Sequence, residues 1–161
     1  MAIFVVRHAK AVPGYPDEFR QLAADGERMA DEMGEHLAST GVKVTRIYHS
    51  GLVRARQTAE ALARHLQPHD GLHHRPGLEP EAEPLPIAAW LETEEETGDG
   101  VMIVSHMPFV DRLVSMLLCG DPDAGLVDYK LCAVARLNMK PTHGYELAWL
   151  LTPKSAGLDR A

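Results

Sequence analysis

The chain has 161 residues, 45% of them hydrophobic and 24% charged, which is typical of one globular domain with a sizeable core. Its formal net charge of −7 argues against nucleic acid or an anionic membrane surface as the main partner. The first apolar run is too short for a signal peptide and no stretch is long enough to span a membrane, so we expect a cytoplasmic protein.

The apolar pattern predicts alternating strands and helices along the chain. The expected strands cover residues 2–6, 44–49, 73–75, 101–105, 130–139 and 145–151. The expected helices cover residues 24–39, 51–66 and 86–96 and the segment that follows Pro108. This order predicts a single α/β domain over residues 1–152, with a mostly parallel central sheet flanked by helices and an antiparallel edge. We expect residues 153–161 to form a C-terminal tail.

Arg7 and His8 come directly after the first apolar strand. A buried strand would hold this pair at the carboxyl edge of the sheet, where open α/β sheets bind their ligands. The guanidinium of Arg7 is a permanent cation whose forked donors suit phosphate. The imidazole of His8 can act as a nucleophile near neutral pH. Together they indicate phosphoryl chemistry on a histidine.

Two further junctions of this kind strengthen the prediction. His106 follows the strand expected over residues 101–105, so two imidazoles are expected at one sheet edge. Arg54 lies in the first turn of the helix that begins after Ser50, where free N–H groups and the helix dipole already favour an anion. We therefore expect His8, His106 and Arg54 to meet around a phosphate.

Three segments carry a family resemblance: Arg7-His8-Ala9-Lys10-Ala11, the stretch from Ser50 to Ala59, and Val104-Ser105-His106-Met107-Pro108. Together they resemble the histidine phosphatase superfamily, also called the phosphoglycerate-mutase-like group. The resemblance extends to about residue 139. The short chain and the form of the first motif are similar to the small SixA-type branch of phosphohistidine phosphatases.

The resemblance implies a role for each of four residues. His8 would be the nucleophile that is transiently phosphorylated, and Arg7, Arg54 and His106 would bind the phosphoryl oxygens. These residue types suit the chemistry, because phosphoryl transfer spreads negative charge over equatorial oxygens that fixed cations and donors can stabilise. No metal or other cofactor is expected, since the arginines supply the positive charge.

Other positions match the family less closely. Arg20 stands where relatives often carry an arginine that faces the site, and Ser50 matches the serine that starts the arginine-bearing helix. Gly51 replaces a usual proline, which is expected to cost rigidity rather than chemistry. Glu79 is the candidate general acid, with a solvated loop carboxylate as the alternative. Lys10 either adds positive potential to the site or faces solvent.

These inferences predict a phosphatase that forms a covalent phosphohistidine on His8 and acts on phosphohistidine in a protein, such as a signalling protein. An imidazole leaves more readily than an alkoxide, which suits a site without an evident acid. Two alternatives in the same chemical class are a general small-molecule phosphomonoesterase and a phosphosugar mutase. Alternatives from other classes are a non-catalytic module that binds a phospho-ligand or partner, and a metal-binding accessory protein. We expect a monomer that binds neither nucleic acid nor membrane.

Overall fold

The computed structural model describes residues 1–94 and 98–158. Short apolar runs form its strands, and segments with apolar residues three and four positions apart form its helices. The strands are β1 (Ala2–Arg7), β2 (Val44–His49), β3 (Leu72–His74), β4 (Gly100–Ser105), β5 (Val134–Met139) and β6 (Tyr145–Leu151). The helices are η1 (Asp17–Phe19, a 3-10 helix), α1 (Ala24–Ser39), α2 (Val53–Leu66), α3 (Leu85–Leu91) and α4 (Phe109–Cys119).

The six strands form one sheet in the order β3-β2-β4-β1-β5-β6. β4 pairs in parallel with β1 and β2, and β2 pairs in parallel with β3, while β5 and β6 complete the sheet as an antiparallel hairpin beside β1. The predicted α/β fold with an antiparallel edge is therefore confirmed. The register sets Arg7 opposite Ser105, so the next residues, His8 and His106, leave the sheet side by side.

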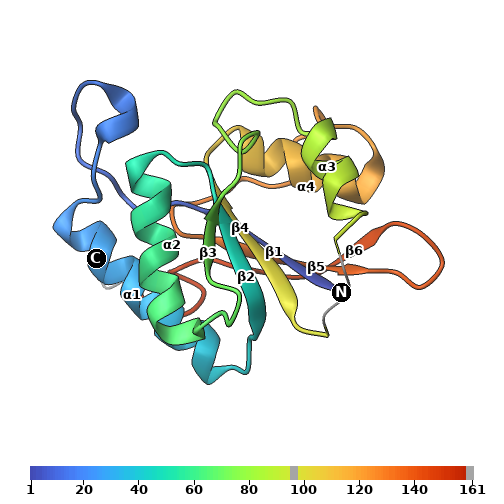
Figure 1. Ribbon diagram of the computed structural model, residues 1–161, viewed down its shortest axis with the longest axis horizontal. Helices are drawn as coiled ribbons and strands as arrows, with labels where there is room; N and C mark the ends of the chain where they lie inside the picture. Colours follow the sequence, from blue (N-terminus) through green and yellow to red (C-terminus); the bar gives the residue numbers. More distant parts are fainter. Residues whose placement is uncertain (95–97, 159–161) are drawn as a thin grey trace.

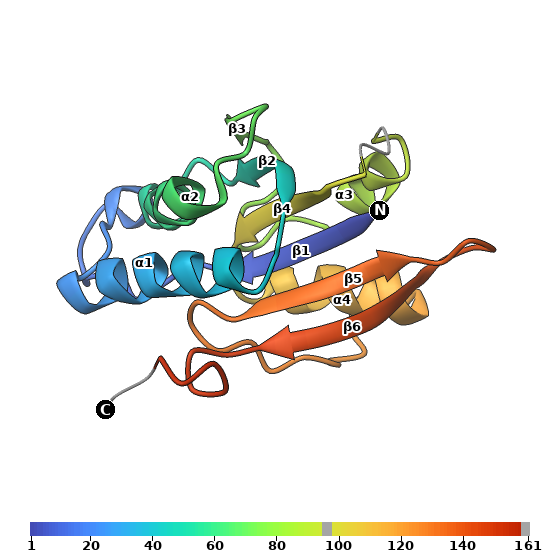
Figure 2. The same ribbon diagram turned by 90° about the horizontal axis from the view of Figure 1, so that it is seen from below.

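The sheet separates two hydrophobic layers. Helices α1 and α2 pack on one face, and α3 and α4 pack on the other (Figures 1 and 2). Side chains of β1 alternate between them: Phe4 and Val6 join the first layer, whereas Ile3 and Val5 join the second. Burial on both faces fixes the strand ends that carry the site. None of the helices within the described residues is long and apolar enough to cross a membrane.

The helix expected over residues 86–96 is shorter than predicted. It ends at Leu91, and the chain then turns so that Glu94 reaches β2. There the Glu94 carboxylate accepts hydrogen bonds from Arg46 Nη1 (2.6 Å) and from the Tyr48 hydroxyl (2.9 Å). The last two residues of the expected helix lie outside the described residues.

One strand and one helix begin later than predicted, because the backbone conformation at their expected starts is not that of a strand or a helix. The strand expected over residues 130–139 starts only at Val134, since Cys132 has a φ of 61° in the preceding turn. The helix expected from residue 51 starts at Val53, since Gly51 has a φ of 90°. A left-handed residue can belong neither to a regular strand nor to an α-helix.

Candidate active site

His8 follows β1 directly, and hydrogen bonds hold its backbone on both sides. Its N–H donates to the Ser105 carbonyl (2.9 Å), and its carbonyl accepts from the Cys132 N–H (3.1 Å). The imidazole Nδ1 lies 2.7 Å from the Ala9 carbonyl, which can only accept, so Nδ1 carries the proton. Nε2 therefore keeps a free lone pair, which is the tautomer that a nucleophilic histidine needs.

The surroundings of His8 keep this ring uncharged at neutral pH. Burial lowers the pKa of His8 to about 4. The hydrogen bond to the Ala9 carbonyl opposes that shift, while the guanidinium groups of Arg54, Arg7 and Arg20 add to it. The cations that disfavour a proton on His8 are also those that would attract a phosphoryl group to it.

His106 follows β4 and faces His8, with the two ring centroids 5.0 Å apart. Its Nε2 lies 2.7 Å from Ser50 Oγ, and its Nδ1 is buried with no hydrogen-bond partner among the described residues. Burial, followed by the neighbouring His8, lowers the pKa of His106 to about 3. Ser50 Oγ accepts from the Leu52 N–H (3.3 Å) and can donate to Nε2, which leaves the single proton of neutral His106 on Nδ1. That N–H has no acceptor among the described residues.

Arg54 lies in the first turn of α2, and its side chain is only 6% exposed. One turn later, Thr58 ties the helix to the segment that follows β1. Its Oγ1 donates to the Arg54 carbonyl (2.8 Å) and accepts from the Ala9 N–H (3.1 Å). Thr58 therefore fixes the position of Arg54 relative to His8. The sequence analysis gave this threonine no role.

Arg7 ends β1, and its Nη1 donates to the carbonyl of Tyr129 (2.8 Å). Tyr129 is itself buried, and its hydroxyl donates to the Val5 carbonyl (2.9 Å), so the arginine is anchored to its own strand. Burial lowers the pKa of Arg7, and the nearby negative charge of Asp128 acts against this shift. A guanidinium nevertheless stays charged in any accessible pH range. Its Nε is buried and has no partner among the described residues.

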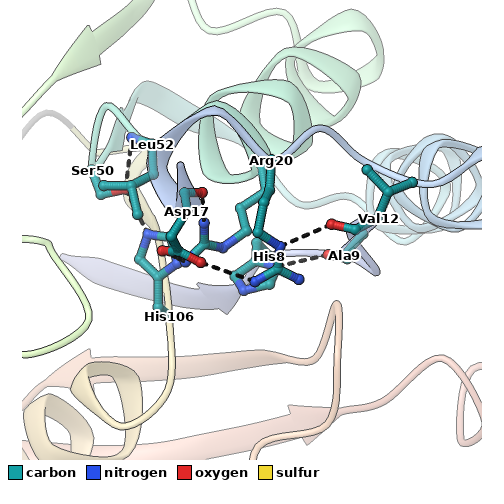
Figure 3. Close-up of polar contacts among 9 residues, drawn as sticks. His8, Ala9, Val12, Asp17, Arg20, Ser50, Leu52 and His106 are labelled. Carbon is teal, nitrogen blue, oxygen red and sulfur yellow. Dashed lines mark hydrogen bonds and ion pairs between the residues drawn. The ribbon is translucent and has the colours of Figure 1, made fainter. Parts of the chain in front are cut away.

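Asp17, in η1, is a site residue that the sequence analysis missed. Its two carboxylate oxygens lie 3.1 Å from Arg20 Nη1 and 3.1 Å from Arg54 Nη2, and its carbonyl accepts from Arg54 Nη1 at 2.9 Å (Figure 3). Arg20 also donates through Nε to the Val12 carbonyl (2.8 Å). Hydrogen bonds from Arg20 and then Arg54 hold the pKa of Asp17 below its usual value. Arg20 is thus linked to Arg54 through the Asp17 carboxylate, which both arginines contact.

Gly51 shapes the turn that carries Ser50. Its φ of 90° is closed to proline and strained for any residue with a side chain, and a Cβ here would lie 2.6 Å from His74 Nε2. The Gly51 N–H donates to His49 Nδ1 (3.1 Å), and the His49 and His74 rings stack with centroids 6.0 Å apart. Ser50 therefore lies against His106 and is not the N-cap of α2.

Two of the predicted residues make contacts of another kind. The Glu79 carboxylate accepts a hydrogen bond from the Gly77 N–H (2.8 Å) within its own loop. Lys10 Nζ lies 2.9 Å from an oxygen of Asp25 on the exposed surface. Within the described residues, no three metal-ligating side chains gather in one place. The positive charge of the site comes from its arginines.

An uncharged histidine among arginines, at the carboxyl edge of a parallel sheet, is an arrangement suited to binding an oxyanion, with the histidine as the candidate nucleophile. The sequence profile of the histidine phosphatase superfamily (branch 1) matches residues 3–79. The chain belongs to this superfamily, as its motifs predict.

Similar proteins agree with this assignment. Phosphohistidine phosphatase SixA of Escherichia coli (strain K12) is 24% identical over 100% of this chain and 99% of that protein. A structure of the protein histidine phosphatase SixA complexed with tungstate has a TM-score of 0.86 and 25% identity, covering 96% of this chain and 98% of that one. The human mitochondrial serine/threonine-protein phosphatase PGAM5 is 38% identical over 65 residues, which cover 40% of this chain and 22% of that protein. This chain is a SixA-like phosphatase of the superfamily.

Proposed function

We propose that this protein hydrolyses phosphohistidine in a protein substrate through a covalent phosphohistidine on His8. The observation that carries the proposal is the uncharged His8 imidazole, whose Nδ1–H is bound to the Ala9 carbonyl and whose ring lies beside His106 and the guanidinium groups of Arg54 and Arg7. A relative that matches the full chain is named phosphohistidine phosphatase, and a structural relative binds tungstate, a tetrahedral oxyanion like phosphate.

In the first step, His8 Nε2 attacks phosphorus and forms a new P–N bond while the bond to the substrate nitrogen breaks. The electron pair of the broken bond stays on the substrate ring, whose other nitrogen already carries a proton, so that a neutral imidazole leaves. Negative charge grows on the equatorial oxygens in the transition state. The donors available to those oxygens are Arg7 Nε–H, the Arg54 guanidinium and His106 Nδ1–H.

In the second step, water attacks the phosphorus of phosphorylated His8. Inorganic phosphate leaves, the electron pair of the P–N bond returns to His8 Nε2, and the water gives up its proton to phosphate or solvent. Because the pKa of His8 is lowered to about 4, the ring is a weak base and therefore a good leaving group. The same burial that keeps the nucleophile uncharged thus favours its release.

The leaving group supports phosphohistidine over a phosphate ester. An alkoxide needs a proton donor as it leaves, whereas a phosphohistidine whose second ring nitrogen carries a proton releases a neutral imidazole without an acid from the enzyme. Glu79, the carboxylate that the sequence offers as an acid, is bound to the Gly77 N–H in its own loop. A general phosphomonoesterase or a phosphosugar mutase would need an acid in this position.

Exposed aromatic residues beside the site favour a protein substrate. Tyr15 is 97% exposed and Phe19 is 63% exposed, and both lie within two residues of Asp17, which contacts Arg54. Large aromatic side chains are enriched in protein interfaces, and a small metabolite would leave these two in water.

The test uses a histidine-phosphorylated protein as substrate for the wild type and for His8→Ala. We expect the wild type to release phosphate and to carry acid-labile, base-stable label, and His8→Ala to be at least about 10³-fold slower without label. The matched control is His143→Ala, because His143 is exposed in the β5–β6 turn at the opposite end of the sheet. This control should retain wild-type activity.

Two results would contradict the proposal. Equal phosphate release by His8→Ala and the wild type would remove His8 as the nucleophile. Faster hydrolysis of sugar phosphates than of the histidine-phosphorylated protein would retain the nucleophile but replace the substrate class with small phosphate esters.

A further inference from the structure

Asp17 makes an unusual contact with the buried arginine of the site. Both terminal nitrogens of Arg54 donate to this one residue, Nη1 to its carbonyl (2.9 Å) and Nη2 to its carboxylate (3.1 Å). The second carboxylate oxygen lies 3.1 Å from Arg20 Nη1. Two oxygens of one anion thus bind two arginines, as two oxygens of a phosphoryl group would.

The two partners of this contact differ in burial. The Arg54 side chain is 6% exposed, whereas the Asp17 side chain is 60% exposed. A buried guanidinium needs an anion or other acceptors, but an exposed carboxylate returns to water at little cost. Asp17 also lies in the short helix η1, which contains no buried residue. The anion can therefore leave while the arginine stays in place.

The contact lies where the phosphate would bind. Figure 3 shows Asp17 on the same side of the sheet edge as His8 and His106. The negative charge of Asp17 raises the pKa of His106 against the larger effect of burial, and the two groups are therefore close enough to interact. An incoming phosphoryl group would meet the Asp17 carboxylate before it reached Arg54.

We propose that Asp17 is a resident anion that occupies a phosphoryl-oxygen position on Arg54 and is displaced when the phosphoryl group binds. This inference rests on the proposed function, because it assigns Arg54 to the phosphoryl group. The contact selects ligands by charge: a dianionic phosphoryl group gains more from the arginines than a monoanionic carboxylate does. The return of Asp17 also favours release of the product, inorganic phosphate.

The expected energetics follow from the equilibrium between occupied and free Arg54. For a ligand that binds only to free Arg54, the apparent dissociation constant is the intrinsic constant divided by the fraction of molecules in which Arg54 is free. Asp17→Asn removes the charge of the competitor and leaves a side chain of the same shape. Glu18→Gln is the matched control, because it makes the same charge change on an exposed neighbour in η1.

The probe is inorganic phosphate, titrated calorimetrically into each purified protein at pH 7.5. We expect Asp17→Asn to bind phosphate about tenfold more tightly than the wild type, and Glu18→Gln to stay within about twofold of it. Product inhibition by phosphate should become stronger in Asp17→Asn by a similar factor. Asp17→Ala, which removes the side-chain oxygens but keeps the backbone carbonyl that accepts from Arg54 Nη1, should also bind phosphate more tightly than the wild type.

The opposite result would overturn the inference. If Asp17 only positions Arg54, then Asp17→Asn and Asp17→Ala bind phosphate as weakly as the wild type or more weakly. Thermal unfolding of each variant shows whether a loss of phosphate binding reflects a loss of fold. If a folded variant binds phosphate with unchanged affinity, the inference that Asp17 is a resident anion is also wrong. Phosphate binding does not depend on turnover. The proposal that phosphohistidine is the substrate could therefore be wrong while the result on Asp17 remains valid.

Discussion

His8 and His106 leave two buried, paired strands, whereas Asp17 and Arg20 reach the same pocket from an exposed turn. On the strand side, defined by Arg7, His8 and His106, the backbone of His8 is hydrogen-bonded in both directions. On the loop side, defined by Asp17 and Arg20, the Asp17 carboxylate is bound, among the described residues, only by the side chains of Arg20 and Arg54, and it is 60% exposed, so water can replace these contacts. Under the two proposals above, the strand side would carry the chemistry and the loop side would control access to it.

Arg54 contacts the loop side and also serves the strand side, so its removal should have the largest effect. Each charge-assisted hydrogen bond is worth about 1.5–3 kcal/mol, and Arg54 can offer two to a phosphoryl group. We expect Arg54→Ala to lower kcat/KM on a histidine-phosphorylated protein by about 10²–10⁴-fold.

The control for this substitution lies two residues further along the same helix. Arg56 is exposed and pairs with Glu60 at 3.3 Å, so Arg56→Ala should change kcat/KM by less than about twofold. If the two variants lost activity equally, the loss would come from the net charge of the helix and not from a contact with phosphate.

The same comparison explains what the sequence could predict. Arg7, His8 and His106 each follow or end an apolar run, and parallel strands bring such positions to one edge regardless of the loops between them. Arg54 was predictable because a helix N-terminus and a cation combine in one short segment. Periodicity and local signals were enough to predict that the residues of the strand side and Arg54 lie near one another.

The rest of the site depends on contacts between distant segments, which periodicity does not encode. Asp17 meets Arg54 across 37 residues, and Thr58 meets Ala9 across 49. Asp17 lies in a loop rich in Pro and Gly, and no sequence pattern there indicates that its carboxylate binds an arginine. Gly51 was misjudged for a related reason: its φ of 90° is set by the path from β2 to α2, so proline would break this turn and not stiffen it.

The buried histidines should give the free energy of unfolding a pH dependence. Burial lowers the pKa of His8 and His49 to about 4 and that of His106 to about 3, against about 6.5 in the unfolded chain. Below pH 6.5 the unfolded chain takes up protons that the folded chain does not, so stability is complete above pH 6.5 and falls as the pH falls toward 4. Each histidine would cost up to about 2 kcal/mol by pH 5.

The contribution of the loop side to the free energy of unfolding should change over a lower range of pH. The pKa of Asp17 is held below its ordinary value of 3.8, chiefly by the hydrogen bond from Arg20. Its contribution is therefore complete above pH 3.8 and is lost only as the pH falls further. Urea unfolding between pH 3 and pH 7.5 would separate the two windows.

His49→Asn tests the histidine window without removing the acceptor for the Gly51 N–H. We expect the loss of stability between pH 6.5 and pH 5 to shrink by up to about 2 kcal/mol in this variant. His143→Asn, on an exposed histidine, should leave the pH dependence unchanged. Identical pH profiles for the two variants would show that His49 does not titrate as its burial requires.

Ser50→Ala should have a smaller effect, because it acts on the strand side through a neighbour. It removes the partner of His106 Nε2 at 2.7 Å and releases the ring proton from Nδ1. A buried group without its partner costs about 1–3 kcal/mol, and we expect kcat to fall about tenfold with little change in KM. Ser39→Ala, which loses only an exposed bond to the His36 carbonyl, is the control. A rise in KM with kcat unchanged would assign Ser50 to substrate binding instead.

Lys10→Met should have the smallest effect, although Lys10 stands only two residues from the nucleophile. Its ammonium pairs with Asp25 at 2.9 Å, and both side chains are about half exposed, so water and salt screen the charge. We expect kcat/KM to change by less than about twofold, and the small change to disappear in 0.5 M salt. A loss close to that of Arg54→Ala would mean that Lys10 leaves Asp25 to bind the phosphoryl group, and the loop side would then extend to the start of α1.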